Sequence, residues 1–288
     1  MSKSYVILGK NGQLGRELQE VYPEALALDL GDVDITSEES LNKIDWSDKS
    51  LIINAAAWTA VDEAEKPENK EKVFAVNGKG PANLAKLAKE NNLGLIHISS
   101  DYVFDGTKKN HSEDEAFAPL SVYGESKADG DQAIINSGLG DYYILRTSWV
   151  VGNGNNFIKT MYELAKKGIK PSVVDDQFGR LTFTSELVRA INYLLTIKAP
   201  YGVYNVTNSG EINSWCDIAK KVYELSGHNE NDVAGVSTEE YYAGKEFIAP
   251  RPMFSDLDMS KIHETGFGSH DYEPIMEEYI NDLKEGEK

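Results

Sequence analysis

The chain has 288 residues, of which 41% are hydrophobic and 26% are charged. This balance excludes a disordered chain, and the length suits one large or two fused domains. The single cysteine, Cys216, excludes an intramolecular disulfide and a multi-cysteine metal site. A net charge of −18, spread over both halves, disfavours nucleic acid as a partner, because phosphate backbones are bound by clustered Lys and Arg.

The apolar residues are distributed in short runs. No run approaches the ~18 residues that a membrane-spanning helix needs, so a membrane is not an expected partner. The segment MSKSYVILGKNG lacks the charged, apolar and small-residue regions of a signal peptide. We therefore expect a cytoplasmic protein, either a monomer or a homodimer.

Short β-rich segments alternate with longer helical ones before residue 150. This alternation is typical of a parallel sheet whose strands are joined by crossing helices. We predict a doubly wound α/β fold of the Rossmann type. The expected helices cover 14–21 and 79–91, and the expected strands cover 5–8, 25–28, 51–54, 94–98 and 142–145.

The pattern changes after about residue 147. Helices are expected over 156–167, 185–196 and 213–226, with a strand over 203–206 and a helix stop at Gly227. We interpret residues 1–150 as a dinucleotide-binding domain, to which a segment near 173–206 returns. Residues 151–288 form a smaller, interleaved substrate domain in this interpretation.

A glycine-rich turn joins the first strand to the first helix. Gly9, Gly12 and Gly15 have the spacing GxxGxxG. Such glycines let the backbone approach a pyrophosphate, and the helix N-terminus offers free N–H groups and a partial positive charge. Glycines also serve ordinary strand-to-helix turns, but the position directly after the first strand favours a dinucleotide site.

Asp29 follows the second strand, 20 residues after Gly9. A carboxylate at this place binds the ribose hydroxyls of the adenosine in dinucleotide-binding folds. A 2′-phosphate there would meet charge repulsion, so we predict that NADH is used at least as well as NADPH, with Lys10 nearby to soften the preference. The alternative is a solvated loop carboxylate.

Tyr123 and Lys127 form a YxxxK pair. On a helix, residues i and i+4 share one face, so the Lys127 ammonium can lie near the Tyr123 phenol. Bringing a tyrosine pKa from ~10 toward ~7 requires about 4 kcal/mol, which a nearby cation helps to supply. A surface tyrosine four residues from a lysine is the simpler alternative.

A third element favours catalysis. Ser100 stands where the strand over 94–98 runs into polar residues, and ligands of this fold bind at the carboxyl edge of the sheet. Its hydroxyl can join Tyr123 in hydrogen-bonding a carbonyl oxygen. The glycine turn, the hydroxyl at the strand end and the YxxxK pair together predict carbonyl chemistry on a dinucleotide.

Several longer motifs extend this pattern, and the chain resembles the extended short-chain dehydrogenases/reductases. Within that superfamily it is most similar to the dTDP-4-dehydrorhamnose reductase family. The motifs that carry the resemblance are GKNGQLGREL at 9–18, NAAAWTAVDEAE at 54–65, SSDYVFDG at 99–106, YGESKADGD at 123–131, RTSWVVG at 146–152, VVDDQFGRLTFT at 173–184 and APRPMFSDLD at 249–258.

The resemblance implies roles for individual residues. It places NADH or NADPH against the first-strand turn and Tyr123 and Lys127 in a catalytic triad with Ser100. The further cofactor residues that it implies are Gly12, Gln13, Leu14, Asp29, Asp34, Ile35, Ala56, Ala57 and Trp58. The substrate residues that it implies are Thr59, Ser100, Asp101, Tyr102, Trp149 and Arg251, the last of these for the diphosphate.

Most of these assignments have a structural alternative. Asp34 can be a helix N-cap, Asp101 a turn residue, Trp149 a core residue and Arg251 a rim ion pair. His97 is more readily a core residue than a catalytic one. His111 and the acids at 113–115 are expected in a solvated surface loop. Glu186 is a weak candidate for a Mg²⁺ site reported among some relatives.

The resemblance implies a reductase. The expected reaction converts the C4 ketone of dTDP-4-dehydro-L-rhamnose to dTDP-L-rhamnose, with Tyr123 as proton donor and Lys127 and Ser100 in support. The alternatives are another nucleotide-sugar enzyme such as a 4-epimerase or a 4,6-dehydratase, a regulatory subunit that kept the fold, and a dinucleotide-sensing module. A dehydratase would want a second acid beside Asp101, and the intact triad argues against the last two.

Overall fold

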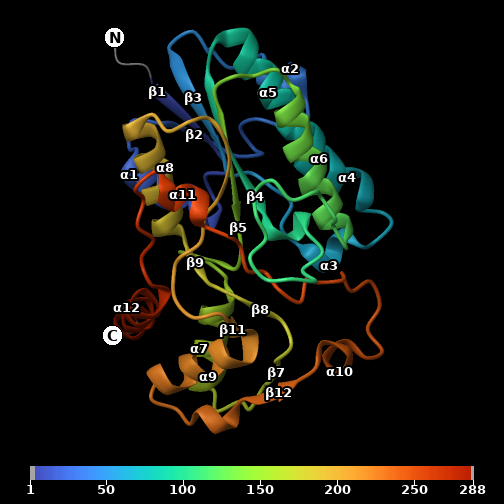
Figure 1. The fold of residues 1–288 in the computed structure, drawn as a ribbon, viewed down its shortest axis with the longest axis vertical. Helices are drawn as coiled ribbons and strands as arrows, with labels where there is room; N and C mark the ends of the chain where they lie inside the picture. Colours follow the sequence, from blue (N-terminus) through green and yellow to red (C-terminus); the bar gives the residue numbers. More distant parts are fainter. Residues whose placement is uncertain (1–3, 287–288) are drawn as a thin grey trace.

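A central parallel sheet organises the protein, as the computed structural model shows for residues 4–286 (Figure 1). Its six strands lie in the order β10-β5-β4-β3-β1-β2, and every neighbouring pair is parallel. The strands are β1 (Ser4–Leu8), β2 (Leu26–Leu28), β3 (Lys49–Asn54), β4 (Gly94–Ser100), β5 (Tyr142–Thr147) and β10 (Gly202–Asn205).

The strand order alone indicates where a ligand site lies in this sheet. The chain moves outward from β1 to β2, then returns to the other side of β1 as β3 and continues outward. The loops that leave β1 and β3 therefore diverge and open a crevice between them at the carboxyl edge. Ligands of doubly wound sheets bind in such a crevice.

The two faces of the sheet are covered by different helices (Figure 1). Alternate residues of β1 divide between them: Ile7 packs with helices α1 (Gln13–Val21) and α8 (Thr184–Ile197), whereas Val6 and Leu8 face the other layer. That layer contains α2 (Glu38–Leu41), α5 (Gly80–Asn91) and α6 (Val122–Asn136). Strands buried on both faces have continuous apolar runs, and β1 and β3 contain such runs at 5–8 and 51–53.

Two short helices precede α5. They are α3 (Val61–Ala64) and α4 (Lys70–Phe74), and the chain passes from α4 to α5 through a π-helical turn, η1 (Ala75–Lys79). The wider turn is lined by Asn77 and Gly78, both buried. Such turns within longer helices frequently occur at functional sites.

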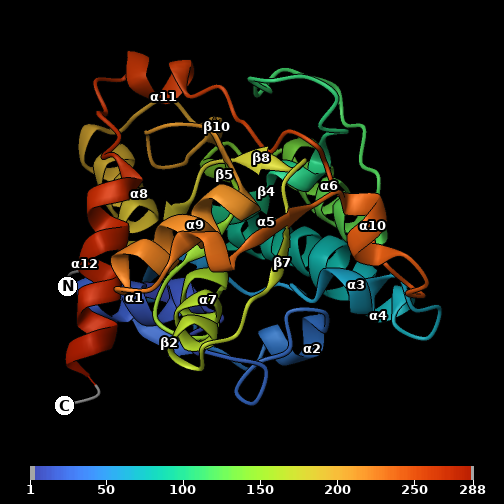
Figure 2. The ribbon, with the colours of Figure 1, turned by 90° about the horizontal axis from the view of Figure 1, so that it is seen from below.

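A second core lies below the carboxyl edge of the sheet. It is built on α7 (Phe157–Lys166), α9 (Trp215–Leu225) and α12 (Tyr272–Glu285), and α7 and α9 pack side by side (Figure 2). In both views α12 lies on one side of this part and α10 (Thr238–Tyr242) on the other. The remaining elements are α11 (Ser260–Glu264), β6 (Val150–Val151), β7 (Ser172–Val174), β8 (Phe178–Gly179), β9 (Thr182–Phe183), β11 (Asn213–Ser214), β12 (Ala234–Val236) and the 3-10 turns η2 (Asp101–Val103) and η3 (Glu230–Asp232).

The expected α/β fold and its elements are confirmed, with small differences at their ends. The clearest difference is at 213–226, where the first two residues form β11 and the helix begins at Trp215. Ser214 caps that helix in a capping box with Asp217, which explains why it starts there. Among residues 4–286, no helix is long and apolar enough to cross a membrane.

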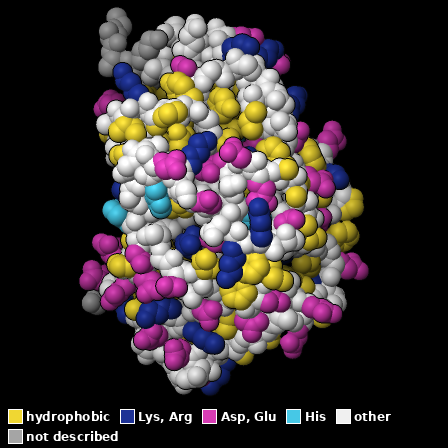
Figure 3. Space-filling model, in the orientation of Figure 1, with side chains coloured by type: hydrophobic (Ala, Val, Ile, Leu, Met, Phe, Trp, Pro, Cys, Tyr) yellow, Lys and Arg dark blue, Asp and Glu magenta, His cyan; other side chains and the backbone are white. Residues whose placement is uncertain are grey.

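The loop after η2 was expected to be solvated, and this prediction is wrong in part. His111 is buried, its ring stacks on Phe104, and its Nδ1 lies 3.0 Å from Oε1 of Glu115. Glu113 accepts a hydrogen bond from the backbone N–H of Asn205. The loop therefore packs against the sheet at β10, where both His111 and Glu113 form hydrogen bonds with Asn205. On the face drawn in Figure 3, by contrast, the acidic side chains are spread widely and interspersed with basic ones.

Candidate active site

A cleft of about 950 Å³ opens at the carboxyl edge of the sheet, between the loops that leave β1 and β3. It extends from the glycine turn past the end of β4 to α7 and α9. Most of the predicted site residues line it: Gly9, Gly12, Gln13, Leu14, Asp29, Asp34, Ile35, Ala56, Ala57, Trp58, Thr59, Ser100, Asp101, Tyr102, Tyr123, Lys127 and Trp149.

The glycine turn forms one end of the cleft. Gly9 has φ +85°, and a Cβ atom on it would come within 2.7 Å of the backbone nitrogen of Ala56. Gly12 caps α1, and a Cβ there would make only a 3.4 Å contact. The backbone at Gly12 thus leaves open space at the helix N-terminus, which fits a pyrophosphate.

Gly15 does not line the cleft, although we expected it to bind the cofactor. It is buried in the first turn of α1, where a Cβ atom would overlap the carbonyl oxygen of Gly9. Its role in this structure is to let the helix approach the turn closely. The third glycine of dinucleotide-binding loops serves close packing of helix against strand in the same way.

A Gly15→Ala substitution is therefore expected to destabilise the protein even without a ligand. Overpacking of this kind costs about 1–3 kcal/mol, and here the obstacle is backbone, which yields little. Urea unfolding of the cofactor-free protein measures the loss. Gly12→Ala is the matched control, because its methyl group would meet only an ordinary contact. Equal stability of the two variants would contradict this account.

Asp29 follows β2 directly, at the rim of the cleft. Its carboxylate accepts hydrogen bonds from the backbone N–H groups of Asn11 and Leu30 at 2.9 and 2.8 Å. Lys10, expected beside Asp29, forms its ion pair with Asp32 instead, at 2.7 Å. The Lys10 ammonium is therefore paired with Asp32 and not with Asp29.

Asp34 lines the cleft and does not cap a helix. Its Oδ1 atom accepts from the backbone and the hydroxyl of Thr36, at 2.9 and 2.8 Å. The N-cap of α2 is Ser37, whose hydroxyl accepts from the N–H of Ser40. The helix-cap alternative for Asp34 is therefore wrong, because the turn at Asp34 precedes the helix by one short loop.

The end of β4 and the turn that follows it bring Ser100 and Asp101 into the cleft. The Ser100 hydroxyl donates to Asp101 Oδ1 at 3.1 Å and accepts from the backbone N–H of Tyr102 at 3.2 Å. Asp101 is buried, and its Oδ2 atom has no partner among the described residues. Burial raises the pKa of Asp101 to about 6, and the nearby Ser255 and Ser100 hydroxyls oppose this shift.

Tyr123 and Lys127 lie one turn apart on α6, as the spacing predicted. The ring of Tyr123 packs edge-on against Tyr102, with the ring centroids 5.3 Å apart. Burial raises the pKa of Tyr123 to about 12, and the nearby Ser100 hydroxyl opposes this shift. In this structure the phenol is thus held protonated. The sequence had led us to expect the opposite shift, a pKa lowered toward ~7.

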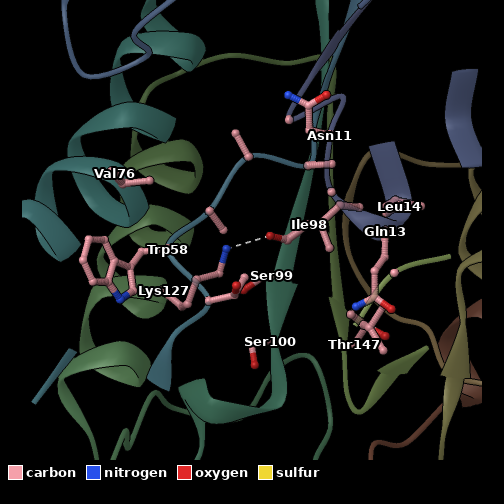
Figure 4. Close-up of a pocket in the computed structure, with 18 of the residues that line it drawn as sticks. Asn11, Gln13, Leu14, Trp58, Val76, Ile98, Ser99, Ser100, Lys127 and Thr147 are labelled. Carbon is pink, nitrogen blue, oxygen red and sulfur yellow. Dashed lines mark hydrogen bonds between the residues drawn. The ribbon is translucent and has the colours of Figure 1, made fainter. Parts of the chain in front are cut away.

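Lys127 is buried, and its ammonium group forms a hydrogen bond with the backbone of β4. Its Nζ atom donates to the carbonyl oxygen of Ile98 at 2.7 Å, the dashed line in Figure 4. Nζ also lies 3.4 Å from Nε2 of His97. Burial lowers the pKa of Lys127 to about 8, although the field of Asp131 opposes the shift.

The π-helical turn positions Trp58, a feature that sequence reasoning missed. Asn77 accepts from the backbone N–H of Trp58 at 2.8 Å and donates to its carbonyl oxygen at 3.1 Å. Its amide also donates to the hydroxyl of Ser126 on α6 at 3.0 Å. The loop after β3 is thereby fixed to the helix that carries Tyr123 and Lys127.

The far wall of the cleft is aromatic. Trp149 has φ +47°, and its ring stacks on Trp215 with centroids 3.6 Å apart, while Gly179 packs against it. Trp149 therefore both lines the cleft and packs in the second core, so the two readings of this residue do not exclude each other. Trp215 was not anticipated, because one tryptophan on an amphipathic helix carries no sign of a site.

Gln13 connects the glycine turn to the second core. Its Oε1 atom accepts from the backbone N–H of Gly152 at 2.8 Å and from Asn156 at 3.4 Å. The Asn156 amide also donates to the hydroxyl of Tyr279 on α12 at 2.8 Å. These bonds tie α12 to the loop that faces the cofactor end of the cleft.

Arg251 and Glu186 lie outside the residues that line the cleft. Arg251 donates to Asp62 at 2.8 Å and stacks its guanidinium 4.8 Å from the ring of Tyr242. Glu186 is buried, and both of its oxygens are bound by Arg189, at 2.7 and 3.0 Å. Each is placed in an ion pair, and no group of three or more His, Cys, Asp or Glu side chains within the described part of the chain is arranged to hold a metal ion.

Arg146 and Asp131 form a buried ion pair next to the helix turn that carries Lys127. Nε of Arg146 on β5 donates to Asp131 on α6 at 2.9 Å, and both side chains are at most 2% exposed. The guanidinium also lies over the rings of Phe104 and Phe117. The pair connects β5 to the last turns of the helix that carries Tyr123 and Lys127.

Known proteins resemble this chain over nearly its whole length. A family model described as RmlD substrate binding domain matches residues 3–285. The dTDP-4-dehydrorhamnose reductase of Aggregatibacter actinomycetemcomitans is 36% identical over 279 residues, 90% of this chain and 92% of that protein. The spore coat polysaccharide biosynthesis protein SpsK of Bacillus subtilis is 34% identical over 96% of each chain.

A solved structure shares the architecture. The dTDP-4-dehydrorhamnose reductase of Bacillus anthracis, in complex with NADP, superposes with a TM-score of 0.88 at 35% identity, over 98% of each chain. The family match and these identities agree with the arrangement of the glycine turn, the end of β4 and α6. The chain belongs to the RmlD substrate binding domain family.

Proposed function

We propose that this protein reduces the C4 ketone of dTDP-4-dehydro-L-rhamnose to dTDP-L-rhamnose, with NADH or NADPH as reductant. The observation that carries the proposal is that Ser100, Tyr123 and Lys127 line the same cleft as the glycine turn. Relatives that bear the name dTDP-4-dehydrorhamnose reductase support it, and so does a relative named dTDP-4-keto-6-deoxy-D-glucose reductase, 34% identical over 92% of this chain.

The residues present fit a nicotinamide dinucleotide. The open backbone at Gly12 suits the pyrophosphate, Asp29 lies where the adenosine ribose belongs, and Ala56, Ala57 and Trp58 continue the wall toward Lys127. A reduced nicotinamide, when bound, supplies the hydride for the ketone carbon. Asp34 and Ile35 line the adenine end in this proposal.

Tyr123 is the proton donor in this mechanism. An alkoxide is a far stronger base than a phenolate, so a phenol with a raised pKa still gives up its proton to the oxygen that forms at C4. The raised pKa also keeps Tyr123 protonated at neutral pH before the reaction. Ser100 adds a second hydrogen bond to the developing oxyanion, and the Lys127 cation stabilises the phenolate that remains.

The remaining cleft residues hold the sugar. Thr59, Asp101, Tyr102 and Trp149 surround the space beyond Ser100 and are our candidates for sugar contacts. Arg251 is the candidate for the diphosphate once its bond to Asp62 is exchanged. All of these residues come from one chain, so the proposal needs no partner subunit, and a reaction that consumes reduced nicotinamide suits a cytoplasmic enzyme.

The proposal is tested by following NADH or NADPH oxidation with a panel of dTDP-4-keto sugars. We expect stoichiometric cofactor consumption that depends on the sugar. Retention of the cofactor through turnover without net oxidation would favour a 4-epimerase, and absence of any reaction would contradict the proposal.

Cofactor choice gives a more specific prediction. A carboxylate at Asp29, on the cleft rim, repels a 2′-phosphate, so the ratio of kcat/KM for NADH over NADPH is expected to be one or greater. Asp29→Asn removes the charge and keeps one of the two acceptor oxygens. It is expected to shift the ratio toward NADPH by about tenfold, the effect of ~1.4 kcal/mol. A strong NADPH preference in the unaltered protein would refute this role of Asp29.

The pH dependence of turnover follows from Lys127. Its pKa is lowered to about 8, so the ammonium is present below that pH and is lost as the pH rises through it. Because the cation stabilises the Tyr123 phenolate, kcat is expected to fall above about pH 8. A pH profile with saturating cofactor and sugar measures this. A plateau that extends through pH 10 would contradict a Lys127 cation that is required for turnover and titrates near pH 8.

A further inference from the structure

His97 is a buried titratable group that the mechanism above does not use. It lies on β4, and its ring is 1% exposed. One ring nitrogen faces Asn54 at the end of β3, and the other faces Lys127 on α6. The ring therefore lies between the loop that follows β3 and the lysine of the candidate active site.

The partners of Asn54 determine which ring nitrogen carries the proton. The backbone N–H of Ala56 donates to Asn54 Oδ1 at 3.2 Å, so this oxygen faces the loop after β3. The Asn54 Nδ2 group then faces His97 Nδ1 at 3.0 Å. An amide NH₂ group can only donate, so Nδ1 must be the acceptor, and in a neutral ring the proton is on Nε2.

The Nε2–H group points at Lys127. Nζ lies 3.4 Å from Nε2, and its bond to the carbonyl oxygen of Ile98, 2.7 Å long, uses one N–H of the lysine (Figure 4). A charged ammonium has no lone pair and would face the Nε2–H proton unfavourably, whereas an uncharged amine can accept it. The His97 Nε2–H group thus discriminates between the two protonation states of Lys127.

We propose that His97 is a positioning residue for Lys127. Its Nε2–H group, oriented by Asn54, stabilises the uncharged amine of Lys127 relative to the ammonium, so that the lysine can exchange a proton near neutral pH. The proposal deepens the proposed function, because Lys127 is the cation that stabilises the Tyr123 phenolate. It also links the charge of Lys127 to the loop at Ala56, since the reverse tautomer would require Asn54 to turn over and to break its bond with that loop.

The surrounding charges are consistent with this inference. Asp131, on the same helix, is the charged group whose field favours the Lys127 ammonium, and Arg146 from β5 neutralises much of it. Tyr123 on α6 and Asp101 in η2 face the cleft side, and Asn54 on β3 is uncharged. Burial holds the pKa of His97 well below its usual value, with the Lys127 charge adding to the effect, so the ring stays neutral.

The tautomer can be measured in the unaltered, cofactor-free protein. The chain has 5 histidines, so long-range ¹⁵N–¹H correlation spectra of histidine-labelled protein are tractable. The His97 signals are assigned by their loss in H97Q. A proton on Nε2 supports the inference, and a proton on Nδ1 overturns it.

The effect on Lys127 is measured by titrating lysine labelled with ¹³C at Cε, again without cofactor. In H97F, which fills the volume but has no N–H, the midpoint of Lys127 is expected to rise by roughly half to one pH unit, as the loss of one neutral hydrogen bond implies. In H97Q, whose amide can replace the N–H, it is expected to stay near the original value. An unchanged or lower midpoint in folded H97F contradicts the proposal.

A control and an activity readout complete the test. Asn83→Leu removes another buried amide, which donates to the carbonyl oxygen of Ile35, and it is expected to lower stability without moving the Lys127 midpoint. In the active protein the alkaline limb of kcat should move with the midpoint in H97F. If the unaltered protein reduces no dTDP-4-keto sugar while the tautomer and midpoint behave as expected, the proposed function fails and the coupling of His97 to Lys127 stands.

Discussion

Tyr123→Phe is expected to lower kcat by about 10²–10⁴-fold, the usual contribution of a positioned general acid. The substitution removes only the phenolic oxygen, and the ring can keep its edge-on contact with Tyr102. Binding of NADH should therefore remain close to that of the unaltered protein. The measurement pairs steady-state turnover with a fluorescence titration of the cofactor.

The matched control is Tyr143→Phe. Tyr143 is also buried, but its hydroxyl donates to the carbonyl oxygen of Ala199 at 2.6 Å, and it does not line the cleft. Its loss should lower stability by about 1 kcal/mol and leave kcat unchanged. Turnover of Tyr123→Phe near that of the unaltered protein would show that another group supplies the proton.

Arg146→Met is expected to cost about 3–5 kcal/mol of unfolding free energy, because it leaves a buried carboxylate without its partner. Asp131 is fully buried, and burial raises its pKa while Arg146 lowers it. Without the guanidinium, the carboxylate must stay charged in an apolar site or take up a proton. Urea unfolding at neutral pH gives the loss of stability.

Two further variants show whether the loss comes from the uncompensated charge. The double variant Asp131→Asn with Arg146→Met removes both charges and is expected to recover much of the lost stability. Lys86→Met breaks an exposed pair with Glu38 and should leave the unfolding curve unchanged. A single Arg146 variant as stable as the Lys86 variant would contradict the buried-charge account.

The fold and the centre of the site could be predicted because their signals are local. Continuous apolar runs at 5–8 and 51–54 predicted strands buried on both faces, and the spacing of Tyr123 and Lys127 predicted one helical face. The site at the carboxyl end of β4 was predicted from the change of Ile98 to Ser99 and Ser100, although the strand itself continues to Ser100. In each case residues a few positions apart determine the outcome.

The parts that were missed depend on contacts between distant segments. Asn77, which accepts a hydrogen bond from Trp58, lies in a π-helical turn, and no spacing in the sequence shows that turn. His111 lies in a polar loop, yet the loop folds over the sheet and buries it. His97 was interpreted as a core residue, and its burial is confirmed, but its contact with Lys127 requires the register of β4 against α6.

The most direct measurement follows a deuterium label from the reduced cofactor into the sugar. NADH deuterated at the transferred position is incubated with dTDP-4-dehydro-L-rhamnose, and the product is analysed by NMR. Reduction of the ketone predicts one deuterium at C4 of dTDP-L-rhamnose for each NADH oxidised, and nearly none with Tyr123→Phe in the same time. A sugar product without deuterium at C4, or no net oxidation of NADH, would contradict the account.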